Sequence, residues 1–174
     1  MGVPPRLAHC VFRTNQLPQM VDWYCRVLGA RINFASDKIA FLTNDEEHHR
    51  IALVATEPYA PRAQGVVVGF YHAAFAHASL GDLLDSYGAL GEQGIRPYRC
   101  INHGPTLSFY YRDPDGNEIE MQVDTFADAA STNAWMQSEA FARNPIGVLV
   151  VPEELIARRT AGEPDASLLR RADS

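Results

Sequence analysis

The chain has 174 residues, of which 47% are hydrophobic and 21% are charged, and its formal net charge is −6. This length and balance are typical of one globular domain with a hydrophobic core. The sequence has no dense cluster of Lys and Arg, which argues against nucleic acid as a partner. The longest apolar runs, such as VVVGF at 66–70, are far too short to cross a bilayer, so we expect no membrane partner.

The cysteine content indicates the compartment. Cys10, Cys25 and Cys100 are an odd number and have no metal-ligand spacing, which indicates structural thiols in a reducing environment. The first ten residues, MGVPPRLAHC, contain no apolar signal segment. We therefore expect a cytoplasmic protein.

Two segments of the chain match each other at an offset of 63 residues: HCVFRTNQLPQMVDWYCRVLG from His9 and HAAFAHASLGDLLDSYGALG from His72. Six positions agree in one register without a gap, which indicates an internal duplication. The matched pairs are His9 with His72, Phe12 with Phe75, Leu17 with Leu80, Met20 with Leu83, Val21 with Leu84 and Tyr24 with Tyr87.

Each repeat predicts a strand, a helix with one apolar stripe and three further strands. Ser79 is the expected N-cap of the second helix, and Gly29 and Gly91 are the expected ends of the two helices. The fold class is therefore α+β, with βαβββ modules at about 6–56 and 66–125 that form a domain over 1–125. The predicted strands are 6–14, 30–35, 38–43 and 48–55 in the first module, and 68–77, 95–100, 106–112 and 117–123 in the second, around helices at 17–28 and 80–90.

Residues 126–174 lie outside the repeat and predict a helical C-terminal extension. We expect helices at 133–142 and 152–161, and we expect the polar residues 162–174 to fray. Two roles stay open for the segment FARNPIGVLVVPEELIARR: it covers the mouth of a cavity, or it builds a dimer interface.

Three side chains are candidate metal ligands. His9 and His72 hold the same place in the two repeats, and strand alternation puts Glu118, Glu120 and Gln122 on one face of the last predicted strand. Taken singly, each histidine reads as a hydrogen-bonded core residue and Glu120 as a solvent-facing carboxylate. Together, two imidazoles and one carboxylate are the facial triad of non-haem Fe(II) enzymes, which leaves positions for substrate and oxygen. We predict that His9, His72 and Glu120 bind a metal.

The paired modules, the two strand-borne histidines and the segment SFYYRDPDGNEIE resemble the vicinal oxygen chelate superfamily. That superfamily includes glyoxalase I, bleomycin-resistance proteins and the type I extradiol ring-cleavage dioxygenases. The resemblance covers about residues 6–125, and it implies that the two modules form a half-open β-barrel around a metal site.

The ligand count favours the dioxygenases within this resemblance. Glyoxalase I enzymes typically have a fourth ligand, a carboxylate on the last strand of the other module. When Ile51 is laid over Ile119, Ala52 falls opposite Glu120, and alanine cannot bind a metal. Three ligands leave room for a diol and for oxygen.

The catalytic residues are implied by the same resemblance. EEHHRIALV resembles the segment of extradiol enzymes in which the second histidine of a pair is the acid/base, so His49 takes that role and His48 is a surface residue. Strand alternation would put His49 on the face of Ile51 and Leu53. Tyr110, ten residues before the glutamate, corresponds to the tyrosine that hydrogen-bonds the substrate.

His103 lies two residues from the register of a further catalytic histidine of the family, and we take it as a third catalytic candidate. The resemblance thus implies an Fe(II)-dependent extradiol dioxygenase, with Mn(II) as the other suitable metal, that inserts O2 into a catechol-type ring next to the diol. Its expected partners are the diol, O2 and further copies of the chain. The alternatives are a glyoxalase-like metal-dependent isomerase or lyase, and a metal-free protein of the bleomycin-resistance type that binds aromatic ligands.

Overall fold

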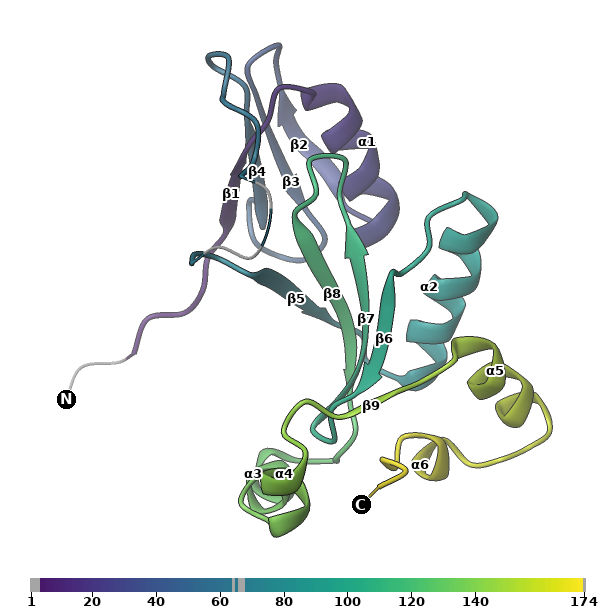
Figure 1. Ribbon diagram of the computed structural model, residues 1–174. Helices are drawn as coiled ribbons and strands as arrows, with labels where there is room; N and C mark the ends of the chain where they lie inside the picture. Colours follow the sequence, from purple (N-terminus) through teal and green to yellow (C-terminus); the bar gives the residue numbers. More distant parts are fainter. Residues whose placement is uncertain (1–3, 64, 66–67, 174) are drawn as a thin grey trace. The chain divides into compact units, whose positions relative to one another are not determined.

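The computed structural model describes residues 4–63, 65 and 68–173, which divide into two compact units. Unit 1 comprises Met1–Phe70 and Asp113–Asn117, and unit 2 comprises Tyr71–Arg112 and Glu118–Ser174. Each unit contains one mixed sheet with a helix (Figure 1), and the predicted α+β fold with two βαβββ modules is confirmed. The boundary at residue 125 stays a prediction, and the predicted start of the second module at residue 66 lies outside the described residues.

Unit 1 is a four-stranded sheet in the order β1-β4-β3-β2, in which β1 is parallel to β4 and the other pairs are antiparallel. Helix α1 packs against β3 and β4 and buries Met20 and Tyr24 completely. The elements are β1 (Cys10–Arg13), α1 (Leu17–Leu28), β2 (Arg31–Ala35), β3 (Ile39–Thr43) and β4 (Ile51–Val54).

Unit 2 repeats this topology in the order β5-β8-β7-β6 and adds a short fifth strand, β9, beside β6. Here too the first strand is parallel to the last strand of the module, and α2 packs against that strand, β8. The elements are β5 (His72–Ala76), α2 (Leu80–Glu92), β6 (Arg99–Asn102), β7 (Thr106–Arg112), β8 (Glu118–Asp124) and β9 (Val148–Leu149).

The two modules share their pairing register as well as their order. Cys10 pairs with Ile51 in unit 1, and Ala73 pairs with Ile119 in unit 2. Cys10 and Ala73 are 63 residues apart, the same offset that relates the two repeated segments. Ile51 therefore corresponds to Ile119, and Ala52 holds the place in unit 1 that Glu120 holds in unit 2.

The helix ends follow from local chemistry, with one exception. Gly29 ends α1 in the left-handed conformation, with φ of 59°, which glycine adopts without strain. The Ser79 side chain accepts a hydrogen bond from the backbone N–H of Asp82 and caps α2, as predicted. The prediction that α2 ends at Gly91 is wrong, because the helix continues to Glu92.

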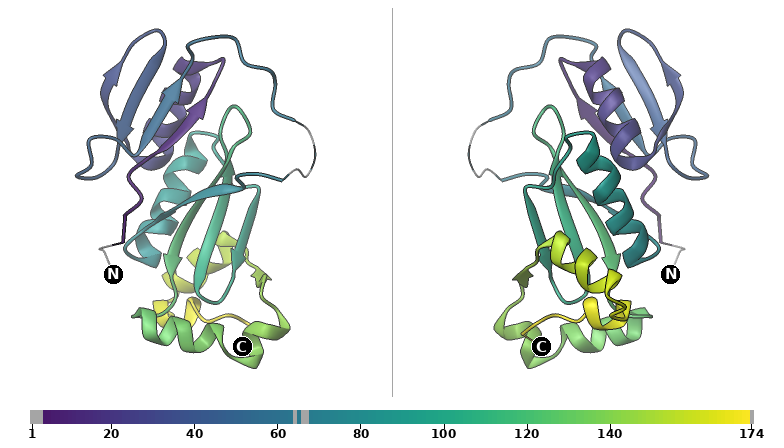
Figure 2. Two further views of the ribbon diagram at one scale, coloured as in Figure 1. Left: turned by 90° about the vertical axis from the view of Figure 1, so that its left-hand side faces the viewer. Right: turned by 90° about the vertical axis from the view of Figure 1, so that its right-hand side faces the viewer.

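The C-terminal extension belongs to unit 2 and winds around one end of its sheet (Figure 2). The helix expected at 133–142 is two helices, and the expectation that residues 162–174 fray is wrong for their central part. Leu168 and Arg171 are only 3% and 4% exposed. The elements of the extension, besides β9, are α3 (Ala129–Met136), α4 (Glu139–Arg143), α5 (Pro152–Thr160) and α6 (Asp165–Leu168).

The described residues include no helix with both the length and the apolar character that a membrane crossing requires. The three cysteines are all free thiols. Burial raises the pKa of the Cys100 thiol to about 12, so this sulfur stays protonated and packs as a small apolar group.

Candidate functional site

One face of the unit 2 sheet carries a row of polar side chains. Pairing sets Ala74 opposite Glu120, Glu120 opposite Tyr110, and Tyr110 opposite Arg99, so these four residues cross the sheet in one line. The alternate residues of β8 are core side chains with 0 to 4% exposure: Ile119, Met121 and Val123. Because side chains alternate along a strand, the open face of this sheet is free to carry chemistry.

The Glu120 carboxylate is 5% exposed, so the interpretation of Glu120 as a solvent-facing group is wrong. Its Oε2 lies 2.9 Å from Nε2 of His72, on the adjacent strand. Nδ1 of His72 is buried and has no hydrogen-bond partner among the described residues. A buried carboxylate is costly unless a positive group faces it.

The spacing of this pair suits a divalent metal. Two donors that each lie about 2.1 Å from one ion and meet at a right angle are separated by about 3.0 Å. An imidazole nitrogen and a carboxylate oxygen are also the donor types that iron and manganese enzymes use. No group of three His, Cys, Asp or Glu side chains suited to a metal ion occurs within the residues described, so the set of His9, His72 and Glu120 stays a prediction.

Tyr110 and His103 form a second polar pair beside this one. Nε2 of His103 lies 2.8 Å from the Tyr110 hydroxyl, and the ring centroids of Tyr110 and His72 are 5.6 Å apart. Burial lowers the pKa of His103, which favours the neutral ring. Burial and the nearby Glu120 carboxylate raise the pKa of Tyr110, so its hydroxyl keeps its proton. The structure thus brings four of the six predicted site residues together in unit 2.

Arg99 is a part of this face that the sequence interpretation missed. Its guanidinium carbon lies 4.7 Å from the centroid of the Tyr110 ring, and its Nη2 donates to the hydroxyl of Tyr71 at 3.3 Å. The strand was expected at 95–100, whereas β6 is Arg99–Asn102. With the correct register, the cross-strand pairing of Arg99 with Tyr110 would have identified this contact.

The other two predicted residues, His9 and His49, lie together in unit 1. Their ring centroids are 4.3 Å apart, and the ring of Phe41 packs against His49 with a centroid distance of 4.7 Å. The backbone brings them together, because the N–H of Cys10 donates to the carbonyl of Arg50 at 2.9 Å. Burial lowers the pKa of His49, and the imidazoles of His9 and His48 lower it further.

The prediction that His49 lies on the face of Ile51 and Leu53 is wrong, although His48 is more exposed than His49, as predicted. Strand β4 begins at Ile51, so His49 precedes it and does not follow its alternation. The His49 ring packs against Phe41, which pairs with Ala52 on the open face, whereas Ile51 is a buried core residue. His48 is exposed and His49 is half-buried. His9 likewise precedes its strand, since β1 begins at Cys10.

Comparison with known proteins agrees with this architecture. Residues 6–121 match the model of the Glyoxalase/Bleomycin resistance protein/Dioxygenase superfamily. The chain is 44% identical over 173 residues to biphenyl-2,3-diol 1,2-dioxygenase 3 of Rhodococcus globerulus, which is 99% of this chain and 91% of that protein. It is 41% identical over 168 residues to biphenyl-2,3-diol 1,2-dioxygenase 2 of the same organism, which is 94% of this chain and 86% of that protein.

Solved structures resemble the repeated part of the chain. A glyoxalase/bleomycin resistance protein/dioxygenase domain from Frankia sp. EAN1pec superimposes with a TM-score of 0.58 and 17% identity, over 70% of this chain and 99% of that one. At this identity the likeness concerns the fold alone. The relationship to the two Rhodococcus proteins extends further, because alignments over 99% and 94% of the chain include most of the C-terminal extension.

Proposed function

Because the chain belongs to the Glyoxalase/Bleomycin resistance protein/Dioxygenase superfamily, we propose that it is an extradiol dioxygenase that inserts O2 into a catechol-type ring next to the diol. The observation that carries this proposal is the similarity, over almost the whole chain, to two biphenyl-2,3-diol 1,2-dioxygenases. The open face of unit 2 supports it, since His72, Glu120 and Tyr110 offer metal-binding and substrate-binding groups in one cluster.

His9, His72 and Glu120 would hold the metal, with Fe(II) as the proposed ion and Mn(II) as the other suitable one. When bound, the ion supplies the positive charge that favours loss of the phenolic protons of the diol. The pair of His72 and Glu120, 2.9 Å apart, supports two of these three assignments. We also propose a cytoplasmic location and a homo-oligomer.

The remaining site residues bind the diol and move its protons. Tyr110 hydrogen-bonds a substrate oxygen and is itself held by His103. His49 accepts a proton from a diol hydroxyl and returns it as the ring opens, a task that suits a histidine near neutral pH. Beside it, Phe41 provides an aromatic surface for an apolar ring.

The equivalence of Ala52 and Glu120 bears on the isomerase alternative. A glyoxalase-like site would need a carboxylate at the place that Ala52 holds in unit 1. Alanine offers no metal donor, so this position supports a three-ligand site and argues against the isomerase. A measurement of metal binding distinguishes the metal-free alternative from the dioxygenase and the isomerase, because both of these enzymes need a metal.

Oxygen consumption tests the proposal. The full-length protein is loaded anaerobically with Fe(II) and mixed with 2,3-dihydroxybiphenyl or catechol, and O2 uptake is followed together with the yellow ring-opened product. We expect turnover that requires Fe(II) and falls at least about 100-fold in His49→Ala, because general acid–base groups typically contribute that much. The neighbouring exposed histidine gives a matched variant, His48→Ala, which removes a ring contact to His49 but keeps the acid–base group, and it should lose far less activity than His49→Ala. Metal binding without opening of any diol would refute the dioxygenase and favour the isomerase.

A further inference from the structure

The loop between β6 and β7 carries His103. Three parts of the C-terminal extension contact this loop: β9 with the preceding Gly147, Arg171, and Trp135. Strand β9 pairs with β6 so that Val148 lies opposite Asn102, and the Asn102 side chain donates to the carbonyl of Leu169 at 2.8 Å. Gly147 has a φ of 102°, and a Cβ there would lie 2.2 Å from the carbonyl oxygen of Asn102. The extension therefore fixes the backbone that bears His103.

Arg171 joins this loop to the rest of the extension. Its side chain is 1% exposed, and its Nη1 donates to the carbonyl oxygens of His103 at 3.1 Å and Asn144 at 2.8 Å. Its Nη2 donates to the carbonyl of Ala140 at 3.2 Å. The planar guanidinium presents donors in a fixed fork, so it can hold several carbonyl groups at once. Asp173 balances its charge, with 2.6 Å between Nε and Oδ1.

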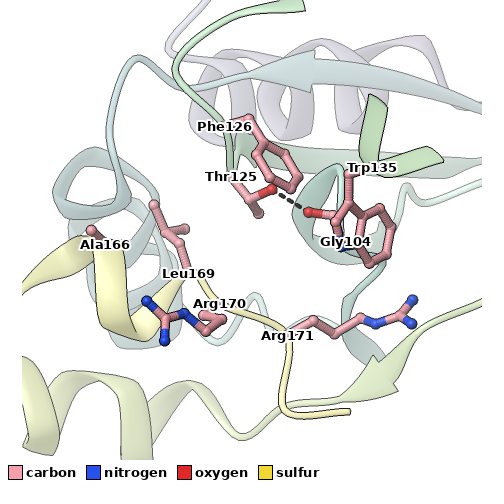
Figure 3. Close-up of a pocket in the computed structure, with 8 residues that line it drawn as sticks. All are labelled: Gly104, Thr125, Phe126, Trp135, Ala166, Leu169, Arg170 and Arg171. Atoms are coloured by element: carbon pink, nitrogen blue, oxygen red, sulfur yellow. Dashed lines mark hydrogen bonds between the residues drawn. The ribbon is translucent and has the colours of Figure 1, made fainter. Parts of the chain in front are cut away.

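Trp135 of the extension packs against Arg171 and against Gly104 of the loop. The guanidinium of Arg171 lies 4.6 Å from the Trp135 ring centroid, and a Cβ on Gly104 would lie 1.9 Å from the same ring. Figure 3 shows Trp135 beside Gly104. Both residues line a cavity of about 360 Å³. Arg170 and Arg171 extend from one segment in opposite directions in this view, and Arg170 is exposed.

The contacts of His103 decide which of its nitrogens carries the hydrogen. Nδ1 faces the carbonyl oxygen of Ile146, which can only accept, so Nδ1 is the donor. Nε2 then accepts from the Tyr110 hydroxyl, and the Tyr110 oxygen keeps a lone pair for a substrate hydroxyl. Arg171 holds both carbonyl-bearing segments, since it binds the carbonyl of His103 and that of Asn144, two residues before Ile146.

We propose that Arg171 is a positioning residue that acts through His103, and that the C-terminal extension is thereby part of the catalytic site. The catalytic consequence rests on the proposed dioxygenase function, whereas the effect on the His103 tautomer does not. Loss of Arg171 frees the segment with Ile146 to move away from Nδ1, so His103 exchanges tautomers and Tyr110 loses its fixed acceptor.

The test compares two adjacent arginines, Arg171→Met and Arg170→Met. Long-range proton–nitrogen NMR of the full-length chain without added metal, labelled with nitrogen-15 in histidine, reports the tautomer of His103, whose signals are assigned with His103→Gln. We expect one Nδ1–H tautomer in the wild type and in Arg170→Met, and a mixture in Arg171→Met. With Fe(II) and 2,3-dihydroxybiphenyl, kcat should fall about 10- to 100-fold in Arg171→Met with little change in KM, since a small misplacement of a site group has effects of this size.

Thermal melting separates positioning from unfolding. If Arg171→Met does not fold, Arg171→Lys replaces it, because its ammonium keeps the charge near Trp135 but lacks the fork of donors. An unchanged tautomer and an unchanged kcat in a folded Arg171 variant would overturn the proposal. If the wild type opens no diol while the tautomer still changes, the proposed function fails and the positioning role stands.

Discussion

The open faces of the two sheets have the same pairing register and opposite chemistry. In unit 2 the line across the sheet runs from Glu120 through Tyr110 to Arg99. In unit 1 the corresponding line comprises Ala52, Phe41 and Phe34. Phe34 is 51% exposed and Ala52 is 2% exposed, so the apolar line runs from the core of unit 1 at β4 to an exposed edge at β2.

The covered faces of the same sheets have hardly diverged in character. Ile51 and Leu53 in unit 1 correspond to Ile119 and Met121 in unit 2, and all four are at most 4% exposed. A one-residue slip would turn every core side chain outward, so the register is strongly selected by the buried face. The residue types on the open face differ between the two units, so the polar row occurs on one copy of the duplicated module alone.

The largest expected effect comes from making unit 2 resemble unit 1 at the metal pair. Glu120→Ala gives unit 2 the residue that unit 1 has at this place. We expect the affinity for Fe(II) or Mn(II) to fall more than about 100-fold, because loss of a ligand exceeds the 10- to 100-fold effect of losing a supporting contact. Titration calorimetry with Mn(II) measures the affinity, and O2 uptake should be abolished.

The control for this variant is the next carboxylate on the same face. Glu118 is the strand partner of His72, but its carboxylate accepts from the Tyr98 hydroxyl at 2.6 Å and pairs with Arg112 at 3.4 Å. Glu118→Gln should therefore bind Mn(II) almost as the wild type does. Equal losses in Glu118→Gln and Glu120→Ala would mean that the metal does not distinguish the two carboxylates, and would contradict the assignment.

A smaller effect on activity is expected at the place where a hydroxyl group distinguishes Tyr110 of unit 2 from Phe41 of unit 1. Tyr110→Phe and Phe41→Tyr exchange phenol and phenyl at corresponding places. Tyr110→Phe should lower kcat up to about 10-fold, the cost of one hydrogen bond from a substrate hydroxyl, while Mn(II) affinity stays unchanged. Phe41→Tyr keeps the aromatic ring beside His49 and should change KM more than kcat, because unit 1 provides no counterpart of His103 at that place. A steady-state comparison in which both variants lose the same activity would remove Tyr110 from its proposed role.

The repeat made most of the fold predictable. The helix expected at 17–28 coincides with α1, and the strand expected at 106–112 coincides with β7, because in both segments the apolar period is uninterrupted. The strand expected at 95–100 was misplaced since Pro97 and Tyr98 precede β6, which begins only at Arg99. The burial of Arg171 was invisible in a polar segment, because its partners are backbone carbonyls that lie about 30 and 70 residues away.

Some site residues were predicted from the internal repeat and others from resemblance to a family, and the structure supports the two groups to different degrees. The contact between His72 and Glu120 depends only on the parallel pairing of β5 and β8, which the order of elements in the repeat implies. His49 was selected by resemblance, and the alternation argument failed because the chain turns between Thr43 and Ile51. The contacts of His103 with Ile146 depend on the extension, for which the repeat offers no template.

The smallest expected effect concerns the helices that cover the two sheets. The Ser79 hydroxyl caps α2, whereas α1 begins after Gln16, whose side chain makes no capping bond. Ser79→Ala should lower the free energy of unfolding by about 1 kcal/mol, and Ser79→Thr, which keeps the hydroxyl, should lose less than half of that. Urea denaturation followed by circular dichroism measures both. Equal losses in the two variants would mean that α2, like α1, is held by its packing on the sheet and not by its cap.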